Sequence, residues 1–149
     1  MYPFNVRVYG LLINDKNEVL ISDEQEYGMC FTKFPGGGLE FGEGLIDGLK
    51  REFIEECDAA VEIVNHFYTT DFFVKSAFND SQVISVYYIV KNVTELNLNI
   101  KTLVFDFDVD GDVLQSFRWT KIADLKAGDF LFPTDQYVVK LLKNNYDAD

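Results

Sequence analysis

Three glutamates near the middle of the chain have the chemistry and the spacing to hold a metal ion. Glu52, Glu55 and Glu56 follow a glycine-rich stretch, residues 34–38, and lie in a segment that predicts a helix. At about 100° per residue, Glu55 and Glu56 fall roughly 60° and 40° to either side of Glu52, so the three carboxylates share one side. Carboxylates about 6 Å apart repel by roughly 3 kcal/mol per pair at an effective dielectric of 20. A cation that lies among them would offset this repulsion. Oxygen ligands of this kind favour Mg²⁺, Mn²⁺ or Ca²⁺.

The apolar residues of the same segment predict how far these glutamates are buried. They form one helical stripe, which consists of Leu45, Ile46, Leu49, Phe53 and Cys57. Glu52 falls at the edge of this stripe and Glu56 falls inside it, so we expect Glu56 to be partly buried. The alternative is that the three glutamates are the solvated face of an amphipathic helix, where like charges cost only a few tenths of a kcal/mol.

The glutamates belong to a longer pattern with fixed spacing. It reads Gly37, five residues, Glu43, seven residues, Arg51-Glu52, the apolar Phe53, one residue and Glu55-Glu56. This pattern resembles the Nudix box, G-x5-E-x7-R-E-U-x-E-E-x-G-U, in which U is an apolar residue. Six fixed residues would match by chance on the order of once in ten million windows at ordinary residue frequencies.

One position departs from the Nudix box. Asp58 stands where the box usually has its last glycine, and the small residue Ala59 follows it. That glycine would end the helix in a left-handed conformation, for which Asp or Asn is the next most tolerant choice. The departure therefore leaves the end of the helix in question and not the glutamates.

The resemblance implies a fold and an activity. It implies an α/β protein with a Nudix-type α/β/α sandwich, in which a mixed β-sheet lies between helices and a single domain covers residues 1–149. It further implies hydrolysis of a pyrophosphate bond in a nucleoside diphosphate linked to another group, with Mg²⁺ or Mn²⁺. By this similarity Glu52, Glu55 and Glu56 hold the metal, assisted by the carbonyl of Gly37. One of these glutamates or a loop acid takes the proton of the attacking water, and Arg51 with Glu43 forms a supporting ion pair.

The N-terminal half must supply the strands that position this site. Residues 4–13 and 18–22 are rich in apolar residues and are separated by the turn-forming residues 14–17, which together predict a hairpin. The acidic residues 23–26 predict an exposed loop, and residues 31–34 predict a short strand that leads into the glycine-rich stretch.

The C-terminal half predicts further strands and a last helix. We expect strands at 61–70, 83–90, 105–110 and 117–119, with 83–90 in the centre of a sheet because it is apolar on both faces. A turn or one-turn helix is expected at 122–125. Residues 135–144 have a helical apolar stripe, and Asp135 is placed to be the N-cap of that helix.

Residues outside the box are candidates for contacts to the substrate. Arg7 can pair with a phosphate if the odd-numbered side of its strand faces the ligand; alternatively it is an edge-strand arginine in solvent. Residues 130–135 are similar to the stretch from which the nucleoside-triphosphate-cleaning branch of the family reads a purine base. This implies that Asp135 bonds to a base edge and Phe132 stacks on the base, although an N-cap and a core phenylalanine explain the segment equally. Asp112 or Asp110 can supply a further metal ligand, since related proteins often add a carboxylate from outside the box, or else belong to the solvated face of a strand.

Composition limits the class of partner. The formal net charge of −12 argues against a nucleic-acid polymer or an anionic membrane as partner, because such surfaces bind basic patches. His66 is the single histidine, and with Cys30 and Cys57 it cannot complete the usual zinc ligand sets. His66 itself is expected to be a half-buried strand residue rather than a catalytic base. The N-terminal residues do not have the pattern of a signal peptide, which predicts a cytoplasmic protein.

Three functions remain open from the sequence. The first is a Nudix hydrolase, with nucleoside triphosphates slightly favoured because residues 58–82 lack the proline typical of sugar-diphosphate and dinucleotide subgroups. The second is a catalytically silent Nudix-like domain that binds or senses a nucleotide. The third is a metal-stabilised protein without a small-molecule substrate. A homodimer is a further possibility, since related proteins often dimerise.

Overall fold

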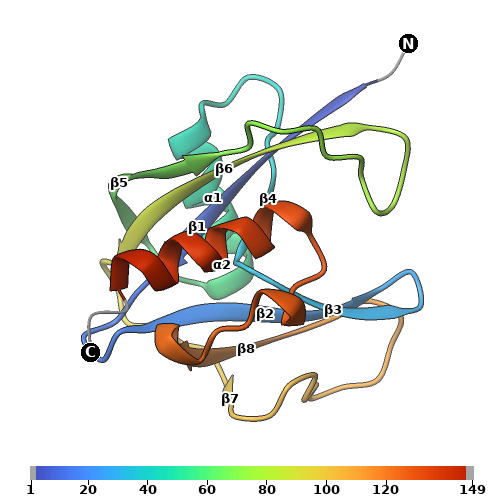
Figure 1. Ribbon diagram of the computed structural model, residues 1–149. Coiled ribbons are helices and arrows are strands. Elements are labelled where there is room, and N and C mark those ends of the chain that lie inside the picture. The colour runs from blue at the N-terminus through green and yellow to red at the C-terminus, as the bar shows by residue number, and fades with distance from the viewer. Residues whose placement is uncertain (1–2, 147–149) are drawn as a thin grey trace. The chain divides into compact units, whose positions relative to one another are not determined.

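The computed structural model describes residues 3–146, and its chain divides into two compact units. The first unit consists of residues 3–12 and Pro35–Asn97, and the second of Ile13–Phe34 and residues 98–146. Each unit has its own four-stranded sheet and one α-helix, and the elements of both are drawn in Figure 1.

The first unit contains the predicted site helix and a mixed sheet. Its strands are β1 (Phe4–Leu12), β4 (Gly36–Gly38), β5 (Val61–Thr69) and β6 (Gln82–Asn92), in the order β4-β1-β6-β5. β1 runs parallel to β6, whereas β4 and β5 are antiparallel to their neighbours. β6 lies between β1 and β5, which confirms the central position predicted for residues 83–90. The predicted glycine loop forms the short edge strand β4.

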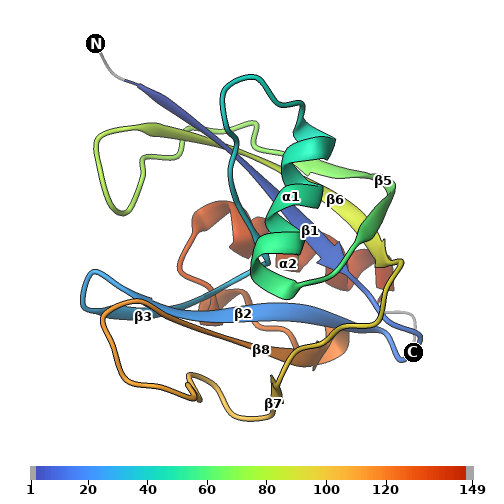
Figure 2. The same ribbon diagram turned by 180° about the vertical axis from the view of Figure 1, so that it is seen from behind.

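Helix α1 (Leu45–Cys57) packs against one face of this sheet (Figure 2). This face carries the even-numbered residues of β1, since Gly10 is directed at Phe53 of the helix. Residues Leu49, Phe53 and Cys57 of the helix are buried, as the apolar stripe predicts, whereas Ile46 of the same stripe is exposed. Helix and strand approach so closely that a Cβ atom on Gly10 would lie 2.4 Å from Cε2 of Phe53. Glycine at position 10 therefore sets the distance between α1 and β1.

The end of α1 shows what replaces the missing glycine of the box. Asp58 adopts the left-handed conformation with φ 48°, and its N–H donates to the carbonyl oxygen of Ile54 at 3.1 Å. Aspartate tolerates this region better than most residues, although it has a Cβ atom. The helix thus ends at the position that the pattern predicts.

The second unit has a second mixed sheet and the C-terminal helix. Its strands are β2 (Glu18–Glu26), β3 (Met29–Lys33), β7 (Ile100–Lys101) and β8 (Leu114–Lys121), in the order β3-β2-β8-β7. Two 3₁₀ turns, η1 (Ile122–Asp124) and η2 (Ala127–Asp129), lead to helix α2 (Pro133–Tyr146) and contact it. The buried apolar side chains of this unit include Leu20, Ile122, Leu125, Phe130, Val138 and Leu142.

The hairpin predicted for residues 4–13 and 18–22 is wrong. β1 and β2 belong to different sheets, and Ile13, just after the end of β1, forms an isolated bridge with Val19 of β2. The predicted turn does form, because the N–H of Asn14 donates to the carbonyl of Glu18 at 3.0 Å. Turn residues fix the local reversal of the chain but not whether the flanking strands stay paired beyond it.

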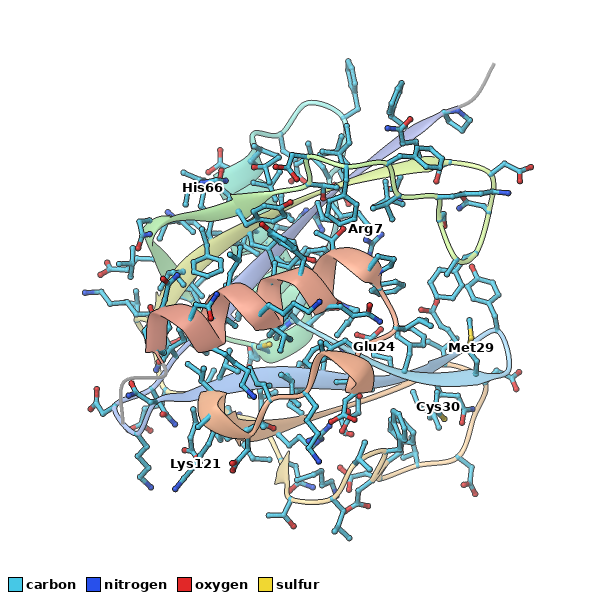
Figure 3. All side chains as sticks on the ribbon, viewed as in Figure 1. Arg7, Glu24, Met29, Cys30, His66 and Lys121 are labelled. Carbon is cyan, nitrogen blue, oxygen red and sulfur yellow. The ribbon has the colours of Figure 1, made fainter. Side chains whose placement is uncertain are left out.

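The exposed acidic loop predicted at 23–26 is also wrong, because these residues continue β2. The carboxylate of Asp23 is fully buried and accepts hydrogen bonds from Arg118 Nε at 2.6 Å and Thr32 Oγ1 at 2.8 Å. Glu24, labelled in Figure 3, is buried as well. Its Oε2 lies 3.0 Å from Nζ of Lys33. Cations on the neighbouring strands β3 and β8 compensate these charges, and a linear pattern cannot reveal such partners.

Two further predictions in the second unit fail. No strand forms at 105–110, where Phe105 has a left-handed φ of 56° and Lys101 binds Asp108; this contact lowers the pKa of Asp108. α2 begins at Pro133, so Asp135 lies in its first turn and is not the N-cap. The N–H of Gln136 donates to the carbonyl of Phe132 at 3.0 Å, which places the start of the helix two residues earlier than expected.

The α/β class with mixed sheets is confirmed, although the strands form two sheets where one was expected. Among residues 3–146, no helix is long and apolar enough to span a membrane.

Candidate active site

The glycine strand β4 and helix α1 bring the predicted metal ligands together in the first unit. A Cβ atom on Gly37 would lie 2.7 Å from the carboxylate of Glu52. Any side chain at position 37 would therefore displace that carboxylate. Glycine is required here because Glu52 occupies the space in which a side chain would lie.

Glu56 and Glu55 differ in their surroundings. The N–H of Gly36 donates to Oε2 of Glu56 at 3.2 Å, so this half-buried glutamate is tied to β4. The side chain of Glu55 is 55% exposed, whereas that of Glu52 is 12% exposed. The expected partial burial of Glu56 is confirmed, and the three glutamates are not an evenly solvated face.

Arg51 links the glutamates to the loop before the helix. Its Nη1 lies 3.1 Å from both Glu52 Oε1 and Glu55 Oε2, and its Nη2 donates to the carbonyl of Gly38 at 3.0 Å. Nε and Nη2 bind both oxygens of Glu43, at 2.9 and 2.6 Å. This forked geometry is typical of a strong arginine–carboxylate pair. The structure thus forms the ion pair between Arg51 and Glu43 that the resemblance implies.

Glu43 is held by more than the arginine. Its Oε1 accepts a hydrogen bond from the backbone N–H of Glu40 at 2.9 Å, and a Cβ atom on Gly48 would lie 2.9 Å from the same oxygen. The hydrogen bonds from Arg51 and then from the Glu40 backbone lower the pKa of Glu43 to about 2, and the pairing raises the pKa of Arg51. The charged pair fixes the loop between β4 and α1 against the first turns of the helix.

We expect the Glu43→Gln variant to lower stability in a pH-dependent way. The pKa of Glu43 is lowered from 4.5 in the unfolded chain to about 2 in the folded protein, so its ionised form is favoured by folding. The contribution is complete above pH 4.5 and is lost as the pH falls through 2. The difference in melting temperature between wild type and Glu43→Gln should be largest at neutral pH and shrink below pH 4.5. Glu95→Gln, at an exposed position, is the control; a difference that is the same at all pH values would contradict the pairing.

The donor atoms at this site suit a hard divalent cation. Glu52, Glu55 and Glu56 offer carboxylate oxygens beside the backbone of β4, and Arg51 Nη1 already lies between two of them. Within residues 3–146 no three Asp, Glu, His or Cys side chains converge as they do around a bound metal. The ligand types and their common location fit Mg²⁺ or Mn²⁺, and closer convergence requires rotation of the side chains.

Arg7 lies on the opposite face of the same sheet. It pairs in register with Gly38, and β1 lies between β4 and β6, so the edge-strand alternative is wrong. The odd-numbered side of β1 carries Arg7 and Tyr9, and Nη1 of Arg7 is 3.7 Å from where Gly38 would place a Cβ atom (Figure 3). The glycine strand therefore has a carboxylate against one face, at Gly37, and a guanidinium against the other, at Gly38.

The remaining candidates lie in the second unit. Phe132 is half-buried with its ring centroid 5.6 Å from that of Phe31, and Asp135 is fully buried in the first turn of α2. Asp112 and Asp110 are exposed, and Asp112 borders a hollow of about 420 Å³ next to the turn between β2 and β3. The roles suggested for these four residues stay predictions.

His66 is a strand residue, as expected, but it is exposed rather than half-buried. Its Nε2 lies 2.8 Å from Thr69 Oγ1, and its ring contacts Tyr88 edge-on at 5.7 Å.

Sequence reasoning missed residues that support the site. Gly48, Tyr9 and Glu40 each contact a predicted site residue in the first unit. Gly48 lies inside the predicted helix, where glycine is unfavourable, and its presence there was a usable signal of a close contact. No comparable signal identified Tyr9, since an aromatic residue in a strand is ordinary.

Comparison with known proteins identifies the family. The sequence model of the NUDIX domain matches residues 3–142, which run through both units. The chain belongs to the NUDIX domain family. The NUDIX match confirms the expected fold, and together with the structures described next it bears out the expectation of a hydrolase. A search among curated proteins found no significant match.

Solved structures share this NUDIX fold over nearly the whole chain. A NUDIX hydrolase from Nitrosomonas europaea is 20% identical, with a TM-score of 0.67, and the match covers 97% of this chain and 89% of that one. A MutT described for Aliivibrio salmonicida and Vibrio cholerae is 25% identical, with a TM-score of 0.62 and coverage of 95% and 98%. An ADP-ribose pyrophosphatase from Streptococcus suis is 15% identical, with a TM-score of 0.62 and coverage of 97% and 94%.

Proposed function

We propose that this NUDIX domain hydrolyses a pyrophosphate bond in a nucleoside diphosphate linked to another group, with nucleoside triphosphates slightly favoured. The observation that carries this proposal is the contact between Glu52 and Gly37, in which a carboxylate fills the space that a side chain at position 37 would need. Together with the pairing of Glu56 to β4, it places two glutamates at the glycine strand. A surface helix with a merely solvated acidic face has no need of such contacts.

In this mechanism Glu52, Glu55 and Glu56, with the carbonyl of Gly37, would hold Mg²⁺ or Mn²⁺. Such an ion, when bound, neutralises pyrophosphate oxygens and lowers the pKa of an attacking water. One of the glutamates, or a loop acid, accepts the proton of that water. Arg51, fixed by Glu43, keeps the glutamates beside β4.

Residues outside the box are proposed to contact the substrate, each considered within its own unit. Arg7 pairs with a phosphate on the face of the sheet opposite α1, where its guanidinium lies next to Gly38. Phe132 stacks on a base and Asp135 bonds to the edge of that base, a role that the similarity of residues 130–135 suggests.

A cytoplasmic location and a homodimer also remain predictions from the sequence.

A substrate panel tests this function. Purified protein is incubated with Mg²⁺ or Mn²⁺ and with nucleoside triphosphates, ADP-ribose, dinucleoside polyphosphates and nucleotide sugars, while phosphate, pyrophosphate and nucleotides are measured. ADP-ribose belongs in this panel because a structural neighbour is an ADP-ribose pyrophosphatase. We expect metal-dependent turnover of at least one compound. Nucleotide binding without any turnover would favour the sensing domain. A melting temperature that depends on the metal, without nucleotide binding and without turnover, would favour a metal-stabilised protein.

A further inference from the structure

One face of the first-unit sheet, opposite α1, presents a tyrosine and an arginine from the same strand. Arg7 and Tyr9 are two residues apart on β1 and therefore point to the same side. Their backbones pair with Gly38 and Gly36, the two ends of the glycine strand. Both side chains thus lie directly beside the strand that the glutamates contact from the other face.

Tyr9 is held rigidly. Its ring stacks on Tyr87 of β6 with centroids 5.1 Å apart, and the residue is only 2% exposed. Its hydroxyl oxygen accepts a hydrogen bond from Nε of Arg7 at 2.6 Å. The guanidinium carbon of Arg7 lies 5.7 Å from the centroid of the tyrosine ring. A buried ring therefore fixes the position of the oxygen that binds the arginine.

This hydrogen bond determines where the arginine points. Binding through Nε restricts rotation about the last bonds of the side chain, and Nη1 is then 3.7 Å from the Cβ position of Gly38. Guanidinium groups recognise phosphate through a fixed planar fork, so holding the plane in advance reduces the entropy lost on binding.

We propose that Tyr9 is a positioning residue, which holds Arg7 ready to bind a substrate phosphate at the glycine strand. This inference rests on the proposed function, because the phosphate is that of the nucleoside diphosphate derivative. Tyr9 acts through Arg7 and not on the reacting atoms. Its hydroxyl therefore contributes to substrate binding and not to the chemical step.

The test combines Tyr9→Phe, Arg7→Gln, Arg7→Lys and the Tyr9→Phe, Arg7→Gln double variant. KM and kcat are measured on the best substrate of the panel. The dissociation constant of the non-hydrolysable α,β-methylene analogue of ATP is measured with Mg²⁺ by calorimetry. Phenylalanine keeps the stacking on Tyr87, so the fold is retained. Tyr88→Phe is the matched control, since Tyr88 pairs with Gly10 and points to the α1 face of the same sheet.

We expect Tyr9→Phe to raise KM and the dissociation constant about 3- to 10-fold with kcat within about twofold of wild type. Arg7→Gln should raise both constants roughly 10- to 100-fold, Arg7→Lys should recover part of the loss, and Tyr88→Phe should change neither. The decisive result is that Tyr9→Phe has no additional effect when Arg7 is already glutamine.

The outcomes separate this inference from the proposed function. Unchanged constants in Tyr9→Phe, or an equal effect of Tyr9→Phe with and without Arg7, would overturn the role of Tyr9 while the hydrolase stands. If the wild-type protein binds the analogue but turns over no compound, the hydrolase fails and the dissociation constants still decide the role of Tyr9. A wild-type protein that neither binds nor hydrolyses overturns both.

Discussion

Replacement of the site glutamates by glutamine should abolish most of the activity while leaving the fold intact. We expect the Glu55→Gln, Glu56→Gln double variant to lower kcat by about 10²- to 10⁴-fold, because the variant loses two of the proposed metal ligands and a proposed proton acceptor. Glutamine keeps the shape of each side chain, and removing two like charges from α1 relieves repulsion. The melting temperature without metal should therefore stay the same or rise. Turnover is measured on the best substrate of the panel, at saturating Mg²⁺.

Single variants and a control on the same helix make this result specific. Glu52→Gln and Glu56→Gln should each cost more than Glu55→Gln, because Glu52 and Glu56 contact β4 and Glu55 is largely exposed. Asp47→Asn removes an exposed carboxylate from α1, roughly 140° around the helix from Glu52. It should leave kcat unchanged. A double variant with wild-type kcat would disprove the role of these glutamates.

Substitution of Gly37 by alanine should damage the site through a single added carbon. The new Cβ atom would lie 2.7 Å from the carboxylate of Glu52, well inside van der Waals contact. Either Glu52 or β4 must move, and we expect kcat to fall about 10- to 100-fold, since small misplacements of catalytic groups are costly. Overpacking should also lower the free energy of unfolding by about 1–3 kcal/mol. Activity and denaturant unfolding are measured in parallel.

Two variants separate the clash from the general effect of alanine. Gly128→Ala adds the same carbon where no atom lies within 4 Å of the new Cβ position, so stability and kcat should not fall. Combining Gly37→Ala with Glu52→Gln tests the coupling, because the second change should cost little once Glu52 is already displaced. Fully additive losses in the combined variant would show that the alanine acts elsewhere.

The local arrangement of the candidate site was predictable because its residues are close together in the sequence. Six fixed residues of the box lie within twenty positions, and a helix with a glycine-rich segment before it defines their geometry. The role of Gly37 in making room for Glu52 follows from the same local arrangement. The sequence left two alternatives for Arg7; the structure excludes the edge-strand alternative, because β1 lies between β4 and β6, and its contact to a phosphate stays a prediction.

The errors arose where residues distant in the sequence meet. Asp23 is acidic and polar, yet Arg118, 95 positions away, neutralises it inside the second sheet. Residues 105–110 alternate like a strand, but Phe105 has a left-handed φ and its N–H donates to Oδ2 of Asp23, 82 positions away, at 3.2 Å. The predicted hairpin failed because β1 pairs with β6, more than seventy residues away. Periodicity describes local conformation, and these outcomes depend on partners that it does not contain.

Arg51 gives the site its own counterion. Its Nη1 is shared by Glu52 and Glu55, while its other nitrogens are held by Glu43 and Gly38. If Glu52 and Glu55 bind a divalent ion as proposed, that ion would compete with the guanidinium of Arg51 for both carboxylates, although the arginine would stay anchored by its remaining bonds. Metal binding would then exchange one cation for another, and occupancy would depend on the free concentration of the divalent ion.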